Sequence, residues 1–146
     1  MKKSVALVIR KRDVDTDVLL VRRPDDDDEF PGMWGLPAAS CRDGEGMMAA
    51  ALRIGVSKLG TQIEIGHEMG VGSQEREAYV IEMTLLEAFL ADCSHITLPR
   101  KGAEGQLRGV TVYTAFRWGP PSDLSGSAAA GSLCSQLLLA DKGLTR

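Results

Sequence analysis

The segment WGLPAASCRDGEGMMAAALRIGVSKLG, residues 34–60, holds the side chains best suited to chemistry. It reads as a short strand, a polar turn and a helix, which is the pattern of a phosphate-handling motif, and it carries Glu45, Arg53 and Lys58. A carboxylate can hold a divalent cation, and guanidinium or ammonium groups can contact phosphate oxygens. The pattern therefore indicates a phosphorylated ligand, although most of the acidic residues of a metal site are missing.

A helix is needed to position these side chains, and the sequence predicts one over residues 46–59 because apolar residues recur there at helical spacing. The apolar face expected to pack on the core consists of Met48, Leu52, Val56 and Leu59. Gly60 suits the C-cap of this helix.

Predicted strands make up most of the remaining chain. A hairpin is expected from strands at 5–9 and 18–21, followed by a loop. Further expected elements are strands at 63–72 and 76–90, of which the second could also be helical, a strand at 110–118 and a helix at 127–140. This order predicts an α+β fold, an α/β/α sandwich with a mixed β-sheet.

Composition favours a small cytoplasmic protein with one domain, residues 1–146. The net charge of −3 offers no basic field for nucleic acid, and no apolar stretch is long enough to span a membrane. The apolar run at residues 5–9 is too short for a signal peptide. Three cysteines without a CxxC pair favour a reducing compartment.

The segment resembles the signature of the Nudix hydrolases, Gly-x5-Glu-x7-Arg-Glu-U-x-Glu-Glu-x-Gly-U with U a bulky aliphatic residue, which usually follows a W-G-L-P-like lead-in. Residues 34–37 match the lead-in, and the box extends from Ala39 to Thr61. Glu45, Arg53 and Gly60 stand at their expected spacing. The resemblance implies a Nudix-like α/β/α sandwich.

Three of the four carboxylates of this signature are missing. Ile54, Ser57 and Lys58 occupy their positions, and Ala39, Gly55 and Thr61 replace other signature residues. Positions 54, 57 and 58 share one helical face, where carboxylates would bind magnesium or manganese. With isoleucine, serine and lysine there, a metal site of the usual geometry is not expected.

The resemblance implies a pyrophosphohydrolase of a nucleoside diphosphate derivative that uses Mg²⁺ or Mn²⁺. Glu45 would then be a metal ligand and catalytic residue, and Arg53 a second catalytic residue. The alternative is an inactive binding or regulatory domain for a nucleotide-like ligand, with no metal. A scaffold that acts through a protein surface, as a homodimer, is a third possibility. The sequence alone leaves open whether the chain is an enzyme.

Each candidate residue also has a structural interpretation. Arg53 and Glu45 could form a strut that pins the loop to the helix. The substrate-binding candidates are Arg23, Trp34 and Lys58, which could instead be a basic strand end, a core residue and a solvated lysine.

Outside the box, Glu75 or Glu77 could supply a distant ligand or base. The acidic run at residues 25–28 is expected to be solvated. Loops at 24–33 and 99–109 are expected to select the ligand.

Overall fold

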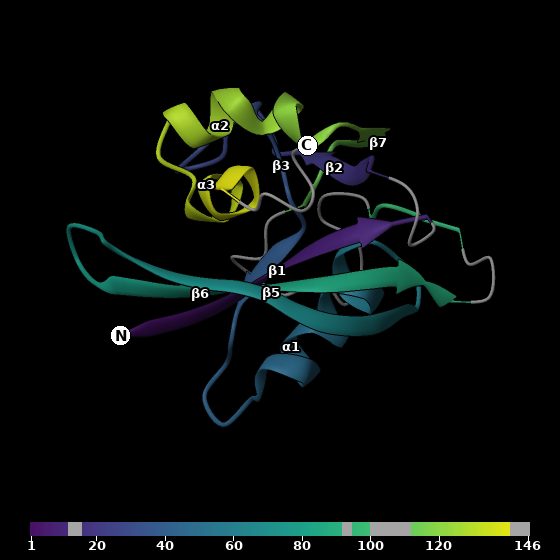
Figure 1. The fold of residues 1–146 in the computed structure, drawn as a ribbon, viewed down its shortest axis with the longest axis horizontal. Coiled ribbons are helices and arrows are strands. Elements are labelled where there is room, and N and C mark those ends of the chain that lie inside the picture. Colours follow the sequence, from purple (N-terminus) through teal and green to yellow (C-terminus); the bar gives the residue numbers. More distant parts are fainter. Residues whose placement is uncertain (12–15, 92–94, 100–111, 141–146) are drawn as a thin grey trace.

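The computed structural model describes residues 1–11, 16–91, 95–99 and 112–140 (Figure 1). Its strands are β1 (Lys2–Arg10), β2 (Val18–Arg22), β3 (Trp34–Gly35), β4 (Ala38–Ser40), β5 (Ile63–Glu75), β6 (Val80–Leu90) and β7 (Ala115–Gly119). Its helices are α1 (Met47–Arg53), a π-helical turn η1 (Ile54–Lys58), a 3₁₀ turn η3 (Pro121–Leu124), α2 (Ser125–Ala129) and α3 (Leu133–Ala140). No helix in these ranges is long and apolar enough to cross a membrane.

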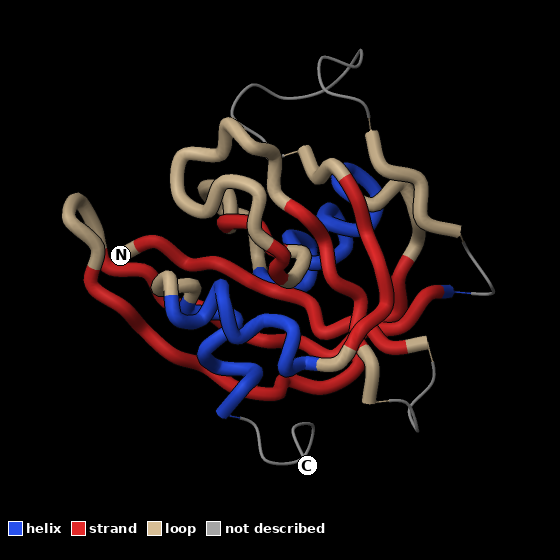
Figure 2. Tube along the Cα trace, turned by 90° about the horizontal axis from the view of Figure 1, so that it is seen from above, coloured by secondary structure: helices blue, strands red, loops and turns tan. Residues whose placement is uncertain are grey.

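The central layer is a four-stranded sheet in the order β4-β1-β6-β5. β1 and β6 run parallel, whereas β4 pairs with β1, and β5 with β6, in antiparallel fashion. Helix α1 lies on one face of this sheet, and α2 and α3 lie on the other (Figure 1, Figure 2). A three-stranded sheet, β3-β2-β7, lies beside the C-terminal helices. The predicted α+β sandwich with a mixed sheet is confirmed.

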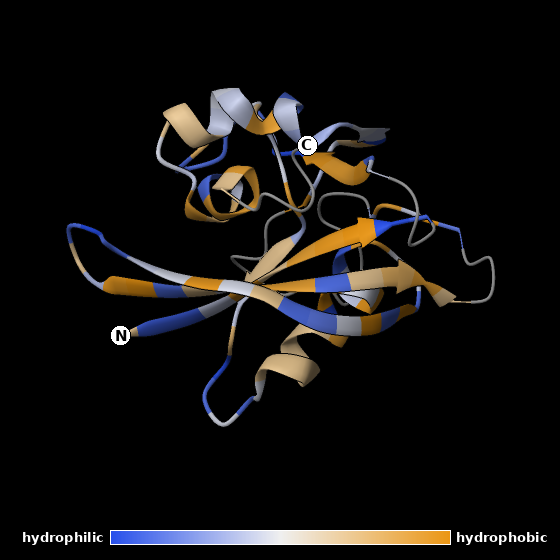
Figure 3. Ribbon diagram, in the orientation of Figure 1, coloured by the Kyte–Doolittle hydropathy of each residue, from blue (hydrophilic) through white to orange (hydrophobic). Residues whose placement is uncertain are grey.

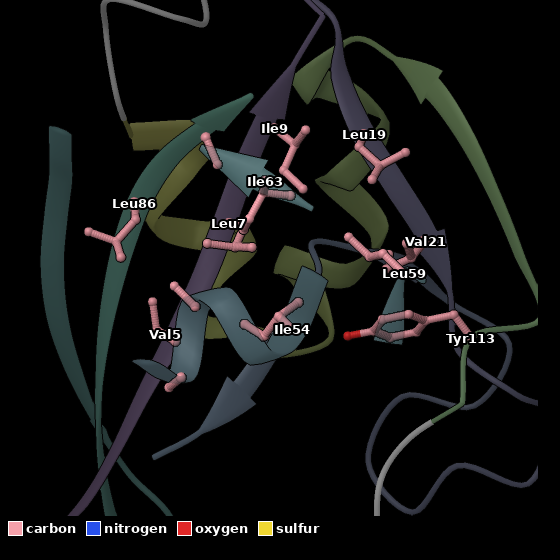
Figure 4. Close-up of a cluster of buried hydrophobic side chains, with 13 residues drawn as sticks. Val5, Leu7, Ile9, Leu19, Val21, Ile54, Leu59, Ile63, Leu86 and Tyr113 are labelled. Carbon is pink, nitrogen blue, oxygen red and sulfur yellow. The ribbon is translucent and has the colours of Figure 1, made fainter. Parts of the chain in front are cut away.

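Strand β1 is buried on both faces, which explains why its sequence is a continuous apolar run. Val5, Leu7 and Ile9 pack with the helix that follows β4, as Figure 4 shows. The alternate side chains Ala6 and Val8 pack with residues of α3 and η3. In Figure 3 this strand changes from hydrophilic at its start to strongly hydrophobic further along. Burial on two sides thus fixes β1 in the centre of the molecule.

The predicted hairpin of strands 5–9 and 18–21 is wrong. Both strands exist, but they belong to different sheets, and β2 pairs with β3 and β7. The reason is that both edges of β1 are already hydrogen-bonded, one to β4 and one to β6. The edge that β4 occupies at residues 4–6 is therefore closed to β2, which pairs with β3 and β7.

The predicted helix at 46–59 exists, but its predicted apolar face is wrong. Exposed fractions on that face are 55% for Met48, 48% for Leu52 and 64% for Val56, and only Leu59 is fully buried. The face that meets the core instead contains Ala50, Ala51 and Ile54, each with 0% exposure. Small alanine side chains let the helix approach the sheet closely, and Met48, Leu52 and Val56 face outward.

The C-terminal prediction is also partly wrong. The single helix expected at 127–140 is two helices, α2 and α3, because Gly131 adopts a φ of 106° between them. The strand expected at 110–118 is confirmed only as β7; residues 110 and 111 lie outside the described ranges. The ambiguous segment at 76–90 contributes strand β6.

Candidate functional site

A cavity of about 400 Å³ opens where β1, β3, β4 and β6 meet the C-terminal helices. Its basic lining residues are Lys2, Arg23, Arg42, Arg53, Lys58 and Arg76. Within the described ranges, Glu29 is the only acidic residue that lines it. The excess of positive charge indicates an anionic ligand.

Three of these basic residues, Lys58, Arg53 and Arg42, lie close to the short strand β4. The Lys58 ammonium donates to the carbonyl oxygen of Ala38 at 2.5 Å. Nη2 of Arg53 donates to the carbonyl oxygen of Ser40 at 2.9 Å, and Arg42 lies two residues further along. The carbonyl oxygens of β4 therefore hold two cations, Lys58 and Arg53, at the cavity, and Arg42 follows shortly after the strand.

Glu45 and Arg53 form a bidentate ion pair. Nε and Nη2 of Arg53 donate to the two carboxylate oxygens of Glu45 at 3.0 and 2.8 Å. The backbone N–H of Arg42 donates to Oε1 of Glu45 at 3.0 Å. The hydrogen bonds from Arg53, and then that from Arg42, lower the pKa of Glu45 to about 2. This geometry matches the strut interpretation, in which the loop before α1 is tied to the end of the helix.

The box positions do not fit a divalent cation. Ile54 is fully buried among apolar side chains, Ser57 is exposed, and Lys58 places an ammonium beside the cavity. Glu45 is engaged by Arg53 and does not line the cavity. The part of the chain that the structure describes contains no group of three or more His, Cys, Asp or Glu side chains that could hold a metal. This donor set is cationic, not the hard anionic oxygen set that magnesium or manganese requires.

The distant carboxylates do not reach this cavity. Glu75 and Glu77 are both exposed, and neither lines it. The arginine between them, Arg76, does line it, and sequence reasoning missed this residue. The sequence predicts a strand from residue 76 onward, whereas Arg76 lies in the turn between β5 and β6.

The loop at 24–33 is anchored to the cavity by a buried ion pair. Nε and Nη2 of Arg23 donate to the carboxylate of Asp27 at 2.9 and 3.1 Å, and this carboxylate is only 7% exposed. Burial alone would raise the pKa of Asp27, but hydrogen bonds from Phe30 and Arg23 lower it. The expectation of a purely solvated acidic run is wrong for Asp27. The other expected specificity loop, 99–109, lies almost wholly outside the described residues.

Aromatic side chains form another part of the cavity lining. Trp34, Phe30 and Tyr79 all contribute. The Arg117 guanidinium lies 4.7 Å from the centroid of the Trp34 ring, and the Lys2 ammonium lies 4.9 Å from that of Tyr79. The three predicted ligand-binding residues, Arg23, Trp34 and Lys58, therefore line one cavity.

Solved structures show which fold surrounds this cavity. No protein-family model and no curated protein matches the sequence. The chain is similar to an Ap4A hydrolase of C. elegans, in a binary complex, with a TM-score of 0.67, 18% identity, and coverage of 94% of this chain and 93% of that chain. It is also similar to a Nudix hydrolase of Nitrosomonas europaea, with a TM-score of 0.65, 16% identity, and coverage of 94% and 85%.

A third similar structure is the Nudix domain of Shewanella oneidensis NrtR in complex with ADP ribose. Its TM-score is 0.57 at 19% identity, and the match covers 85% of this chain and 75% of that chain. The protein therefore has the Nudix fold, and the fold implied by the resemblance is confirmed.

Proposed function

We propose that this protein binds a small phosphorylated, nucleotide-like molecule through its own cationic side chains, without a divalent cation. The observation that carries the proposal is that Lys58, Arg53 and Arg42 line one cavity, with Lys58 and Arg53 held on carbonyl oxygens of β4. Lys58 supplies positive charge on the helix where the resemblance places a metal ion.

Three of the six lining cations retain capacity to bind a ligand. In the described ranges, Lys2, Arg42 and Lys58 form no salt bridge with a carboxylate, whereas Arg53 is paired with Glu45. An ammonium has three N–H donors, and Lys58 uses one on the Ala38 carbonyl, so two remain. Charge-assisted hydrogen bonds from such groups to phosphate are about twice as strong as neutral ones. A phosphate group can therefore be held here by lysine and arginine alone.

The aromatic part of the cavity favours a ligand with a base or another flat ring. Aromatic residues supply faces on which a nucleobase can stack, and the cavity volume lies within the range of small-molecule sites, roughly 300–1,000 Å³. One similar structure is a domain in complex with ADP ribose, which is a nucleoside diphosphate joined to a sugar. We therefore choose ADP-ribose and ADP as probes.

Hydrolysis of a phosphoanhydride is the function that the resemblance implies, but the observed side chains support it less well than binding. That chemistry would use Mg²⁺ or Mn²⁺ held by Glu45. The carboxylate of Glu45 is already satisfied by Arg53 and Arg42, and it lies outside the cavity lining. Binding without turnover is therefore the better-supported function.

The test is a calorimetric titration of the protein with ADP-ribose and ADP in EDTA, with product formation followed by chromatography in parallel. We expect saturable binding and no product, with or without added Mg²⁺. A thermal melt gives a second measurement. A ligand at a hundred times its Kd stabilises a protein by about 2.7 kcal/mol, so Tm should rise by roughly 5–11 °C. Ordinary magnesium-dependent turnover would contradict the proposal.

Neighbouring lysines on β1 provide a matched pair of variants. Both lysines are exposed, but Lys2 lines the cavity and Lys3 does not. We expect Lys2→Gln to weaken binding and Lys3→Gln, which removes the same charge from the next residue, to leave it unchanged. Equal losses for both variants would indicate a general effect of net charge and not a defined site.

A further inference from the structure

Glu29 is placed where it can compete with an anionic ligand. It is the single carboxylate among the lining residues of the described ranges, and its Oε2 atom lies 2.5 Å from Nη1 of Arg76. Arg76 also lines the cavity, and 47 residues separate the two in sequence. In the described part of the chain, three of the six lining cations, Arg23, Arg53 and Arg76, are thus paired with internal carboxylates, and Arg76 is the one whose partner also lines the cavity.

The two partners of this pair are held differently. Arg76 is fixed in the turn between β5 and β6: its Nε donates to Gln74 at 2.6 Å, and its backbone N–H donates to the carbonyl of Tyr79 at 2.7 Å. Its side chain is 21% exposed. The Glu29 side chain is 43% exposed, and Arg76 is the partner that its carboxylate has within the described ranges. The carboxylate is therefore the partner that can move away while the guanidinium stays in place.

We propose that Glu29 is a specificity-determining residue that selects ligands by their negative charge, which rests on the proposed function. A phosphate that binds Arg76 approaches the Glu29 carboxylate on the same guanidinium. Like charges repel, and the repulsion grows with the charge of the ligand. Glu29 therefore weakens the binding of the more highly charged ADP more than that of AMP.

The experiment measures the Kd of AMP and of ADP by calorimetry at one ionic strength, for the unaltered protein and for Glu29→Gln. We expect Glu29→Gln to bind ADP about fivefold more tightly, because the competing carboxylate charge is gone. AMP carries less charge and gains less, so the preference for ADP over AMP increases. The matched control is Asp25→Asn: Asp25 pairs with Arg22 at 2.7 Å and does not line the cavity. Its affinities should not change.

A second background shows whether Glu29 acts through Arg76. In Arg76→Gln, we expect weaker ADP binding, and adding Glu29→Gln should then produce little further gain. Thermal unfolding of each variant shows whether it is folded. If the unaltered protein binds ADP but Glu29→Gln binds ADP no more tightly than Asp25→Asn does, this inference alone is wrong. If neither nucleotide binds any variant, the proposed function fails as well.

Discussion

Replacing Ile54 with glutamate restores one carboxylate of the box by sequence, but the structure predicts that the protein will be severely destabilised. Ile54 has no exposed surface and packs in a cluster with Val5, Leu7 and Leu59, as Figure 4 shows. The same change at Val56, two residues along the same helical segment, places the carboxylate on a side that is 64% exposed. The pair separates the effect of burial from the effect of added charge.

The size of the loss follows from two terms. Burial of an isoleucine side chain contributes about 1.5–3 kcal/mol, and burying an unpartnered polar group costs about 1–3 kcal/mol in proteins. Ile54→Glu should therefore lower the free energy of unfolding by roughly 3–6 kcal/mol, a large part of the 5–15 kcal/mol typical of a domain. At about 2–4 °C per kcal/mol, Tm should fall by roughly 6–24 °C. Val56→Glu should stay within about 0.5 kcal/mol.

Urea unfolding followed by circular dichroism measures both variants. Burial raises the pKa of an introduced carboxyl group above its unfolded value of about 4.3. The loss in Ile54→Glu should therefore be smaller below about pH 4, where the group is neutral in both states, and should grow as the pH rises through the folded pKa. If Ile54→Glu were as stable as Val56→Glu, the packing of Ile54 described here would be wrong.

One further variant and one further pair of variants test local features. The pKa of Glu45 is about 2 in the folded protein, below its ordinary value of 4.5. The stability that Glu45 contributes is therefore present above about pH 4.5 and is lost as the pH falls toward 2. Glu45→Gln should remove this acid-sensitive contribution, which urea unfolding at several pH values measures. Gly60 has a φ of 61°, and an added Cβ would lie 2.1 Å from the carbonyl oxygen of Thr97. Gly60→Ala should therefore cost more than about 1 kcal/mol, whereas Gly126→Ala, where the Cβ meets open space, should stabilise by roughly 0.4–1 kcal/mol in a thermal melt.

Local signals in the sequence were sufficient for the main elements and for one ion pair. The apolar run of β1 predicts a strand because a buried strand exposes neither face. Glu45 lies in the loop just before α1 and Arg53 is the last residue of that helix, so the two are close in sequence, and the structure pairs their side chains. Gly60 could be placed at the helix end because a left-handed conformation there favours glycine.

Features that depend on distant parts of the chain were not predictable in the same way. Hydrophobicity alone predicts that Met48, Leu52 and Val56 face the core. The space between the helix and the sheet instead accommodates the small side chains of Ala50 and Ala51. The pair of Glu29 and Arg76 joins two loops that only the fold brings together. No periodicity within either loop carries that information.

We propose that Lys58, with Arg53 and Arg42, replaces a divalent cation in binding phosphate. The most direct test is the Kd of ADP-ribose measured in EDTA and again in Mg²⁺, for the unaltered protein and for Lys58→Gln. We expect the same affinity under both conditions, and a loss of about tenfold or more in Lys58→Gln, since a hydrogen bond to a charged group contributes about 1.5–3 kcal/mol. Binding that appears only with Mg²⁺, or that is unaffected by Lys58→Gln, would contradict the account.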